Sequence, residues 1–214
     1  MNSGPGSASG ASEKGWIKVA FDPRYWIPCP YQFPPGMDLD SWATGMSQGW
    51  WEQSGLTYQD ASVEQLATML RLLHERGYAA VPAHQIWIYL RDPAIPPLPV
   101  HIGIWKQEGD RRGRLREFTG ADDKASARKP QVDEFTTDSL GAGLRVMRYR
   151  KRPSGALVGV LCYAFRSEEF ETDVSVTIAS PDLRELMTAT EDIDQFIRGI
   201  TVYDNQSPPE QAQV

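Results

Sequence analysis

The sequence predicts a single α+β domain, in which an antiparallel sheet of about six strands is flanked by helices. Short apolar runs separated by turn residues fill the second half of the chain, which indicates antiparallel strands with short connections. Two segments of the first half repeat apolar residues at helical spacing. A length of 214 residues with 41% hydrophobic residues is sufficient for one sizeable core.

The predicted strands are bounded by Pro, Gly or charged residues. They are Trp16 to Phe21, Gln85 to Leu90, Val100 to Trp105, Val132 to Thr137, Leu144 to Lys151, Leu157 to Arg166, Glu171 to Ala179 and Ile200 to Tyr203. Leu157 to Arg166 is the most uniformly apolar run, so we expect it at the centre of the sheet. A further short strand is expected near Leu115 to Phe118, within the charged loop Lys106 to Pro130.

Helices are predicted in both halves of the chain. Leu39 to Gln53 carries an apolar stripe, and a second helix begins at a capping box formed by Ser62 and Gln65. Gly77 is expected to end that second helix. Ser180 to Asp182 supplies an N-cap, a first-turn proline and a carboxylate, which together predict the start of the C-terminal helices.

Residues 1–14 and 206–214 are predicted to be a disordered leader and a disordered tail around a domain at 15–205, because both contain few apolar residues. The leader has neither the basic start nor the apolar stretch of a secretory signal, and no apolar run is long enough to span a membrane. With only Cys29 and Cys162, no disulfide framework is expected. These features predict a cytoplasmic protein without membrane insertion.

The net charge of −6 is unevenly distributed. Lys106 to Arg152 contains 13 basic and 8 acidic residues, whereas the remaining residues are strongly acidic. Acidic side chains are interleaved with the arginines, which is typical of a solvated loop. Nucleic-acid binding needs clustered and unopposed positive charge, so we expect none.

One short pattern is typical of catalysis. Gly45 to Gly49 matches the G-x-S-x-G of a nucleophile elbow, but the residues before it predict a helix where the elbow needs a strand. The three histidines, His74, His84 and His101, all precede residue 102 and show no metal-ligand spacing. We therefore expect no enzyme, cofactor or metal site, and keep a serine hydrolase using Ser47 as an alternative.

Aromatic side chains in the Pro-rich segment 22–36 and in the helix after it form the candidate binding site. Trp50 and Trp51 diverge by about 100° on a helix, so we expect one of them at a groove or interface. Aromatic residues are enriched at protein interfaces. The alternative is that this segment only covers the sheet. The candidate residues are Tyr25, Trp26, Tyr31, Phe33, Trp50 and Trp51.

The order of the last elements resembles the PsbP-like fold. The resemblance rests on a late strand that runs through Val174 to Asp182 into a Ser-Pro turn, and on the helix Ile193 to Ile200 before a short strand. The chain is also similar to an uncharacterised group of actinobacterial proteins that carry the Phe21 to Pro28 stretch. PsbP-like domains are mostly accessory and binding modules, so the resemblance implies a non-enzymatic role.

Together, these observations predict a non-catalytic cytosolic interaction module with a protein partner, such as an accessory protein of a secretion or envelope system. A toxin-neutralising immunity protein, whose acidic part would face a basic target, is the other alternative.

Overall fold

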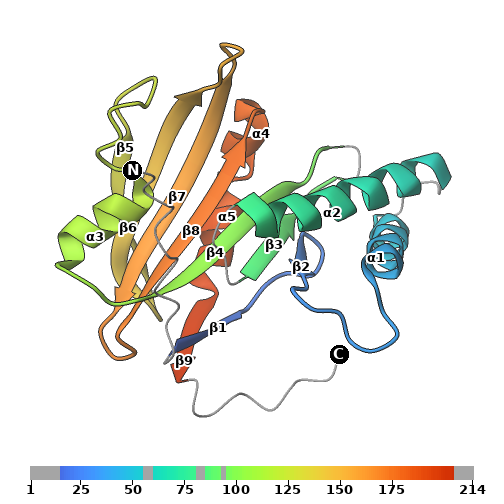
Figure 1. Cartoon of the computed structure of the whole chain (residues 1–214), viewed down its shortest axis with the longest axis horizontal. Helices are drawn as coiled ribbons and strands as arrows, with labels where there is room; N and C mark the ends of the chain where they lie inside the picture. The colour runs from blue at the N-terminus through green and yellow to red at the C-terminus, as the bar shows by residue number, and fades with distance from the viewer. Residues whose placement is uncertain (1–14, 55–59, 81–84, 93–94, 205–214) are drawn as a thin grey trace, which may run out of the picture.

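A seven-stranded antiparallel sheet with the order β2-β3-β4-β8-β7-β6-β5 forms the centre of the computed structural model (Figure 1). The structure describes residues 15–54, 60–80, 85–92 and 95–204, so the expected disordered leader and tail lie outside the described residues. The described elements are β1 Gly15–Val19, β2 Trp26–Cys29, α1 Leu39–Gln53, α2 Asp60–Ala80, β3 Gln85–Tyr89, β4 Leu98–Lys106, α3 Arg111–Thr119, β5 Gln131–Thr137, β6 Gly141–Lys151, β7 Leu157–Ser167, β8 Thr172–Ser180, α4 Leu183–Thr188, α5 Thr190–Arg198 and β9 Ile200–Asp204. The predicted α+β class and single domain are confirmed.

Six predicted strands form β3 to β8 of the sheet, and the seventh is β2, within the Pro-rich segment 22–36, where no strand is predicted. Pro28 has no N–H to donate, which excludes a central position but is tolerated at the sheet edge that β2 occupies. The first and last strands pair with each other outside this sheet, with Ile17 opposite Val202. The central position predicted for Leu157 to Arg166 is confirmed, because β7 lies between β6 and β8.

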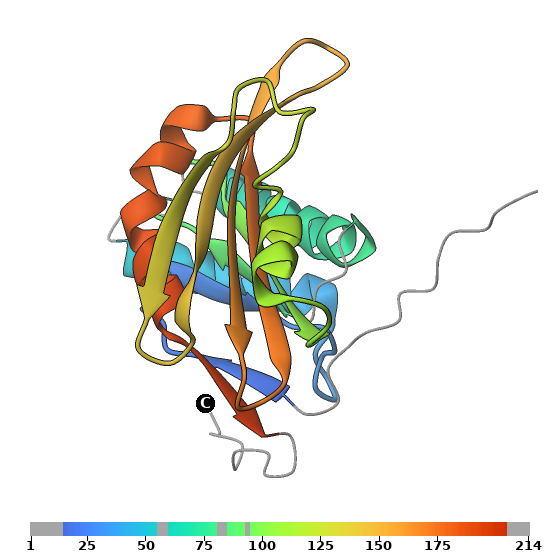
Figure 2. The ribbon, with the colours of Figure 1, turned by 90° about the vertical axis from the view of Figure 1, so that its left-hand side faces the viewer.

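The two faces of the sheet are covered differently. On one face, α4 and α5 lie along the strands and the β1–β9 ribbon lies near one end of the sheet, whereas the opposite face carries α1 and α2 at one side and α3 at the other (Figures 1 and 2). Buried side chains divide accordingly into two clusters. The larger contains Val176 and Phe196, and the smaller contains Leu66 and Ile88 between the helices and β2 to β4.

The strand expected near Leu115 to Phe118 is wrong, because these residues belong to α3. Asp110 caps that helix by accepting a hydrogen bond from the Gly113 N–H at 2.8 Å. Gly120 ends it in the left-handed conformation, with φ of 63°. Leu115 and Thr119 are the only buried residues of α3. Because so few of its residues are buried, the sequence of this charged helix lacks the apolar stripe that would predict a helix.

Helix α1 begins as a capping box, in which the Ser41 N–H donates to Asp38 Oδ1 at 2.8 Å and the Asp38 N–H donates to Ser41 Oγ at 2.9 Å. It crosses α2 steeply (Figures 1 and 2). The expected stop at Gly77 is wrong, because α2 continues to Ala80. A Cβ at Gly77 would lie 2.8 Å from Ile86 Cδ1, so this glycine permits close packing on β3. Among the described helices, none is long and apolar enough to cross a membrane.

Candidate functional site

The aromatic segment enters the sheet through a turn that its own charges stabilise. Arg24 Nε donates to Asp22 Oδ1 at 3.0 Å and Nη2 donates to Oδ2 at 2.6 Å. The same guanidinium lowers the pKa of the Asp22 carboxyl, chiefly through these hydrogen bonds. The Tyr25 and Trp26 N–H groups both donate to the Asp22 carbonyl, at 3.1 and 3.2 Å. This turn holds Tyr25 at the start of β2.

Trp26 is a core residue, although it is predicted as part of a binding surface. Its ring stacks on Phe196 with 3.8 Å between centroids and lies 5.0 Å from the Tyr89 ring. Only 4% of the residue is exposed. Alternation along β2 points Trp26 to the face covered by α5, whereas Ile27 points to the helices α1 and α2.

The other predicted aromatic residues are spread over different surroundings. Phe33 packs on the smaller core and stacks on His74 at 5.3 Å between centroids. Tyr31 is 69% exposed, whereas Trp50 and Trp51 are both buried. The expectation that one of this pair lies at a groove or interface stays a prediction. Trp50 belongs to the core and also forms the wall of a pocket.

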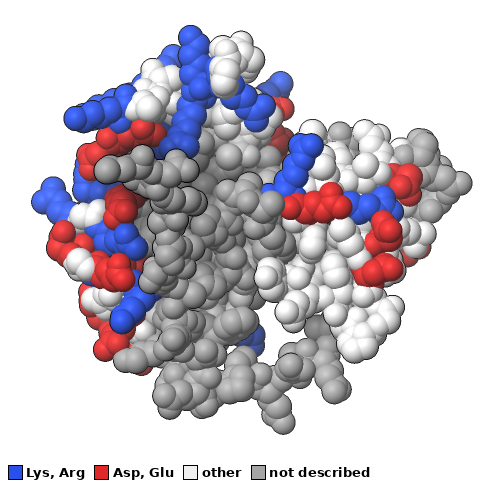
Figure 3. Space-filling view, viewed as in Figure 1, with Lys and Arg blue, Asp and Glu red and all other residues white. Residues whose placement is uncertain are grey.

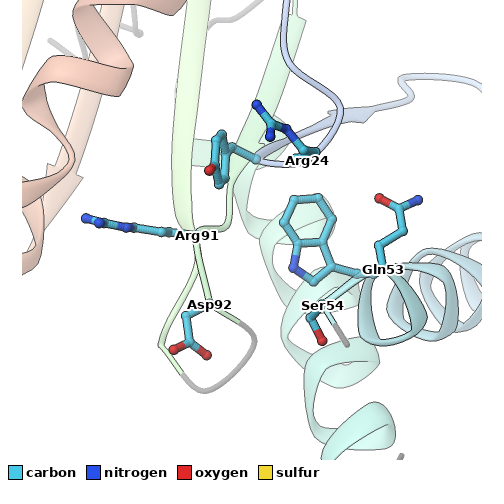
Figure 4. Close-up of a pocket in the computed structure, with 7 residues that line it drawn as sticks. Arg24, Gln53, Ser54, Arg91 and Asp92 are labelled. Carbon is cyan, nitrogen blue, oxygen red and sulfur yellow. The ribbon is translucent and has the colours of Figure 1, made fainter. Parts of the chain in front are cut away.

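That pocket lies where the turn before β2, the end of α1 and the turn after β3 meet (Figure 4). Its volume is about 340 Å³, and it is lined by Arg24, Tyr25, Trp50, Gln53, Ser54, Arg91 and Asp92. In the close-up, the Arg91 guanidinium extends to the side away from Gln53 and Ser54 (Figure 4). Two predicted residues, Tyr25 and Trp50, thus share one pocket.

The pocket combines cations with aromatic walls. The Arg24 side chain is 73% exposed, and its guanidinium lies 5.4 Å from the Tyr25 ring centroid. Guanidinium groups bind carboxylates with two parallel hydrogen bonds, and aromatic walls accept apolar side chains. Ser54 Oγ donates to the Trp51 carbonyl at 2.7 Å as part of the helix end. An exposed guanidinium beside aromatic side chains is suited to binding.

Five residues that line the pocket were not predicted from the sequence: Arg24, Gln53, Ser54, Arg91 and Asp92. Arg24 directly precedes the predicted site residue Tyr25, so its position in the sequence could have added it to the candidate residues. Arg91 follows the predicted strand Gln85 to Leu90, but no local pattern reveals that this strand end faces α1. The hydrogen bond from the Leu90 N–H to the Tyr25 carbonyl, at 2.9 Å, joins the two segments.

A second pocket, of about 600 Å³, lies on the opposite side of Tyr25. Its walls include Phe21, Trp26 and Phe196, together with Asp138 and Asp192. Asp192 Oδ2 accepts a hydrogen bond from the Tyr89 hydroxyl at 2.5 Å. Burial and this carboxylate raise the pKa of the Tyr89 hydroxyl, which therefore remains a donor. The Asp192 carboxylate thus has a structural role in holding α5 on the sheet.

The surroundings of Ser47 do not match a nucleophile elbow. The predicted helix at Gly45 to Gly49 is confirmed, and Ser47 lies in the middle of α1 with 0% exposure. Its Oγ has no hydrogen-bond partner among the described residues. Within the described part of the chain, no group of three or more His, Cys, Asp or Glu side chains is placed to hold a metal ion.

Comparison with known proteins does not assign a family. No protein-family model matches the chain, and no curated protein matches it. A solved structure that it resembles is LpqN, described as involved in cell envelope biogenesis of Mycobacterium tuberculosis. The identity is 10%, the TM-score is 0.49, and the match covers 91% of this chain and 85% of that chain. The PsbP-like fold, the actinobacterial group and the cytoplasmic location remain predictions.

Proposed function

We propose that the chain is a non-catalytic protein-interaction module, and that it binds a partner segment in the pocket between α1 and the turn before β2. The observation that supports this function is the convergence of Tyr25 and Trp50 with Arg24 and Arg91. Trp, Tyr and Arg are the residues most enriched at the energetic centres of protein interfaces.

The pocket favours a partner segment with a large apolar side chain next to a carboxylate. The apolar side chain would lie against Tyr25 and Trp50. The carboxylate would meet the Arg24 guanidinium, whose Nη1 makes no hydrogen bond to another described residue. Arg91 adds a second exposed cation to the residues that line the pocket, and it forms no ion pair with the described carboxylates.

Peptides selected on the wild-type chain from a random displayed library test this site. Arg24→Ala and Arg91→Ala are each expected to weaken the selected peptides about tenfold, because truncating an interface arginine costs more than about 1 kcal/mol. Arg112→Ala is the control, because Arg112 is exposed on α3 and is not among the residues that line the pocket. Isothermal titration measures the affinities. Peptides without a carboxylate, or equal affinity for all three variants, would contradict the proposed site.

A second experiment tests whether Ser47 is a catalytic nucleophile. The folded chain is expected to remain unlabelled by a fluorophosphonate probe, because a reactive serine needs an accessible hydroxyl and a nearby base. Intact-mass measurement before and after incubation detects the adduct. An adduct that forms on the wild type and is lost in Ser47→Ala would instead support the hydrolase alternative. The immunity-protein alternative remains a prediction that no described feature favours.

A further inference from the structure

Six exposed cations gather at one end of the sheet, where the loop after α3 meets the β6–β7 hairpin. Both segments extend beyond the other strands at the same end in two perpendicular views (Figures 1 and 2). The space-filling view shows Lys and Arg over this end (Figure 3). We call these residues the basic end: Lys124, Arg128, Lys129, Arg150, Lys151 and Arg152.

Hydrogen bonds hold the loop against the hairpin. The Ala127 N–H donates to the Tyr149 carbonyl at 2.7 Å, and Ser126 Oγ donates to the same carbonyl at 3.1 Å. At the hairpin tip, the Arg152 N–H donates to the Ala156 carbonyl at 2.8 Å. Gly155 has φ of 86°, which favours glycine at that turn. The cations therefore lie on a defined surface.

The folded chain separates charges that are mixed in the sequence. Asp123 lies in the loop after α3, where Arg148 binds it at 2.6 Å and Arg150 lies at 3.4 Å. Asp122 accepts a hydrogen bond from Arg116 Nε at 2.8 Å. Both carboxylates are thus engaged by arginines, and Lys124 and Lys129 form no ion pair with described residues.

An apolar side chain lies among these cations. Leu157 is 41% exposed and stands opposite Lys151 in the β6–β7 pairing. Pro153 and Ala156 at the hairpin tip are also exposed. Cations around an exposed apolar tip match the two layers of an anionic bilayer surface, namely charged headgroups over hydrocarbon. Duplex nucleic acid offers phosphates but no apolar layer, so the tip favours a lipid surface.

We propose that the basic end is a docking surface for an anionic lipid bilayer, with the β6–β7 tip touching the headgroup region. The contact is peripheral and involves no membrane-spanning segment. Because the whole chain carries a net charge of −6, binding must arise from this local reversal of charge, and it should weaken as salt rises.

Co-sedimentation of the full chain with vesicles is the test. Vesicles of phosphatidylglycerol and phosphatidylcholine are expected to bind the chain, and vesicles of phosphatidylcholine alone are not. Each Lys or Arg near an anionic surface contributes about fivefold in partitioning, so Lys124→Gln, Lys129→Gln and Lys151→Gln together should weaken binding about a hundredfold. The matched control with the same change of charge combines Lys18→Gln, Arg76→Gln and Lys106→Gln, all at exposed positions.

Leu157→Ser distinguishes a bilayer from other polyanions. It should weaken binding to the anionic vesicles severalfold, because it removes the apolar contact and leaves every charge in place. A duplex DNA oligonucleotide, measured by fluorescence anisotropy, should bind more weakly than the vesicles. DNA binding as tight as vesicle binding, no effect of Leu157→Ser, or equal losses in the two triple variants would each overturn a bilayer docking surface.

Discussion

Asp173→Asn is expected to lower the free energy of unfolding by about 3–5 kcal/mol, because it leaves a buried charge uncompensated. Arg166 Nε donates to Asp173 Oδ1 at 2.6 Å, and Nη2 donates to Oδ2 at 2.9 Å. The two side chains are 2% and 0% exposed. An Asn amide would retain one acceptor and would turn an N–H group toward the guanidinium. Urea unfolding followed by circular dichroism measures the change.

The same arginine also connects the sheet to the segment before α3. Its Nη1 donates to the Gly109 carbonyl at 2.9 Å, and its Nη2 donates to the Glu108 carbonyl at 2.8 Å. Replacing both charged residues, as Arg166→Met with Asp173→Leu, should recover only part of the lost stability, because those carbonyls lose their donors.

Glu64→Gln is the control for a surface ion pair. Glu64 lies 3.0 Å from Arg71 but is 66% exposed, and exposed pairs contribute at most about 1 kcal/mol. If Asp173→Asn destabilised the chain no more than Glu64→Gln, the buried pair would contribute no more than a surface pair.

Trp26→Ala is expected to destabilise the chain by about 3–5 kcal/mol, as is usual when a large aromatic residue is removed from a core. The substitution removes the ring that stacks on Phe196 at 3.8 Å and leaves a cavity between β2 and α5. Thermal and urea unfolding measure this loss. A large effect would assign Trp26 to the core. Its neighbours Tyr25 and Arg24 would then remain the residues of this turn that line the candidate pocket.

Tyr31→Ala is the matched control from the same aromatic segment. Tyr31 is 69% exposed, and surface substitutions usually change stability by less than about 0.5 kcal/mol. Equal and small effects of the two substitutions would show that Trp26 contributes little to the core and is available for a ligand.

Strong local patterns predicted most of the fold. The apolar run in β7 identifies a strand because a central strand is buried on both faces. The apolar stripe in α1 identifies a helix because burial of one side imposes a period of 3.6 residues. The weak patterns misled. Helix α3 has few apolar residues, so its sequence shows no clear helical period. Strand β2 contains Pro28, which argues against a strand in the sequence and is tolerated only because β2 lies at the edge of the sheet.

The candidate site was predictable only in part. Aromatic richness predicted a site in residues 22–36 and α1, and Tyr25 and Trp50 line one pocket. Which rings face the core depends on the face of the sheet to which each strand residue points. Trp26 points into the core and is therefore not part of the surface. Arg91 joins the pocket across a long interval of sequence, which no local pattern can show.

By itself, the sequence determined the α+β class and the elements with strong periodicity, because those follow from local burial and backbone preference. Only the tertiary structure decided which charges oppose one another. Asp173 meets Arg166 across neighbouring strands, Asp123 meets Arg148, and the six cations of the basic end are left together at the surface. Charge interactions depend on distance in space. Only the folded chain places Asp123, in the loop after α3, beside Arg148 in β6.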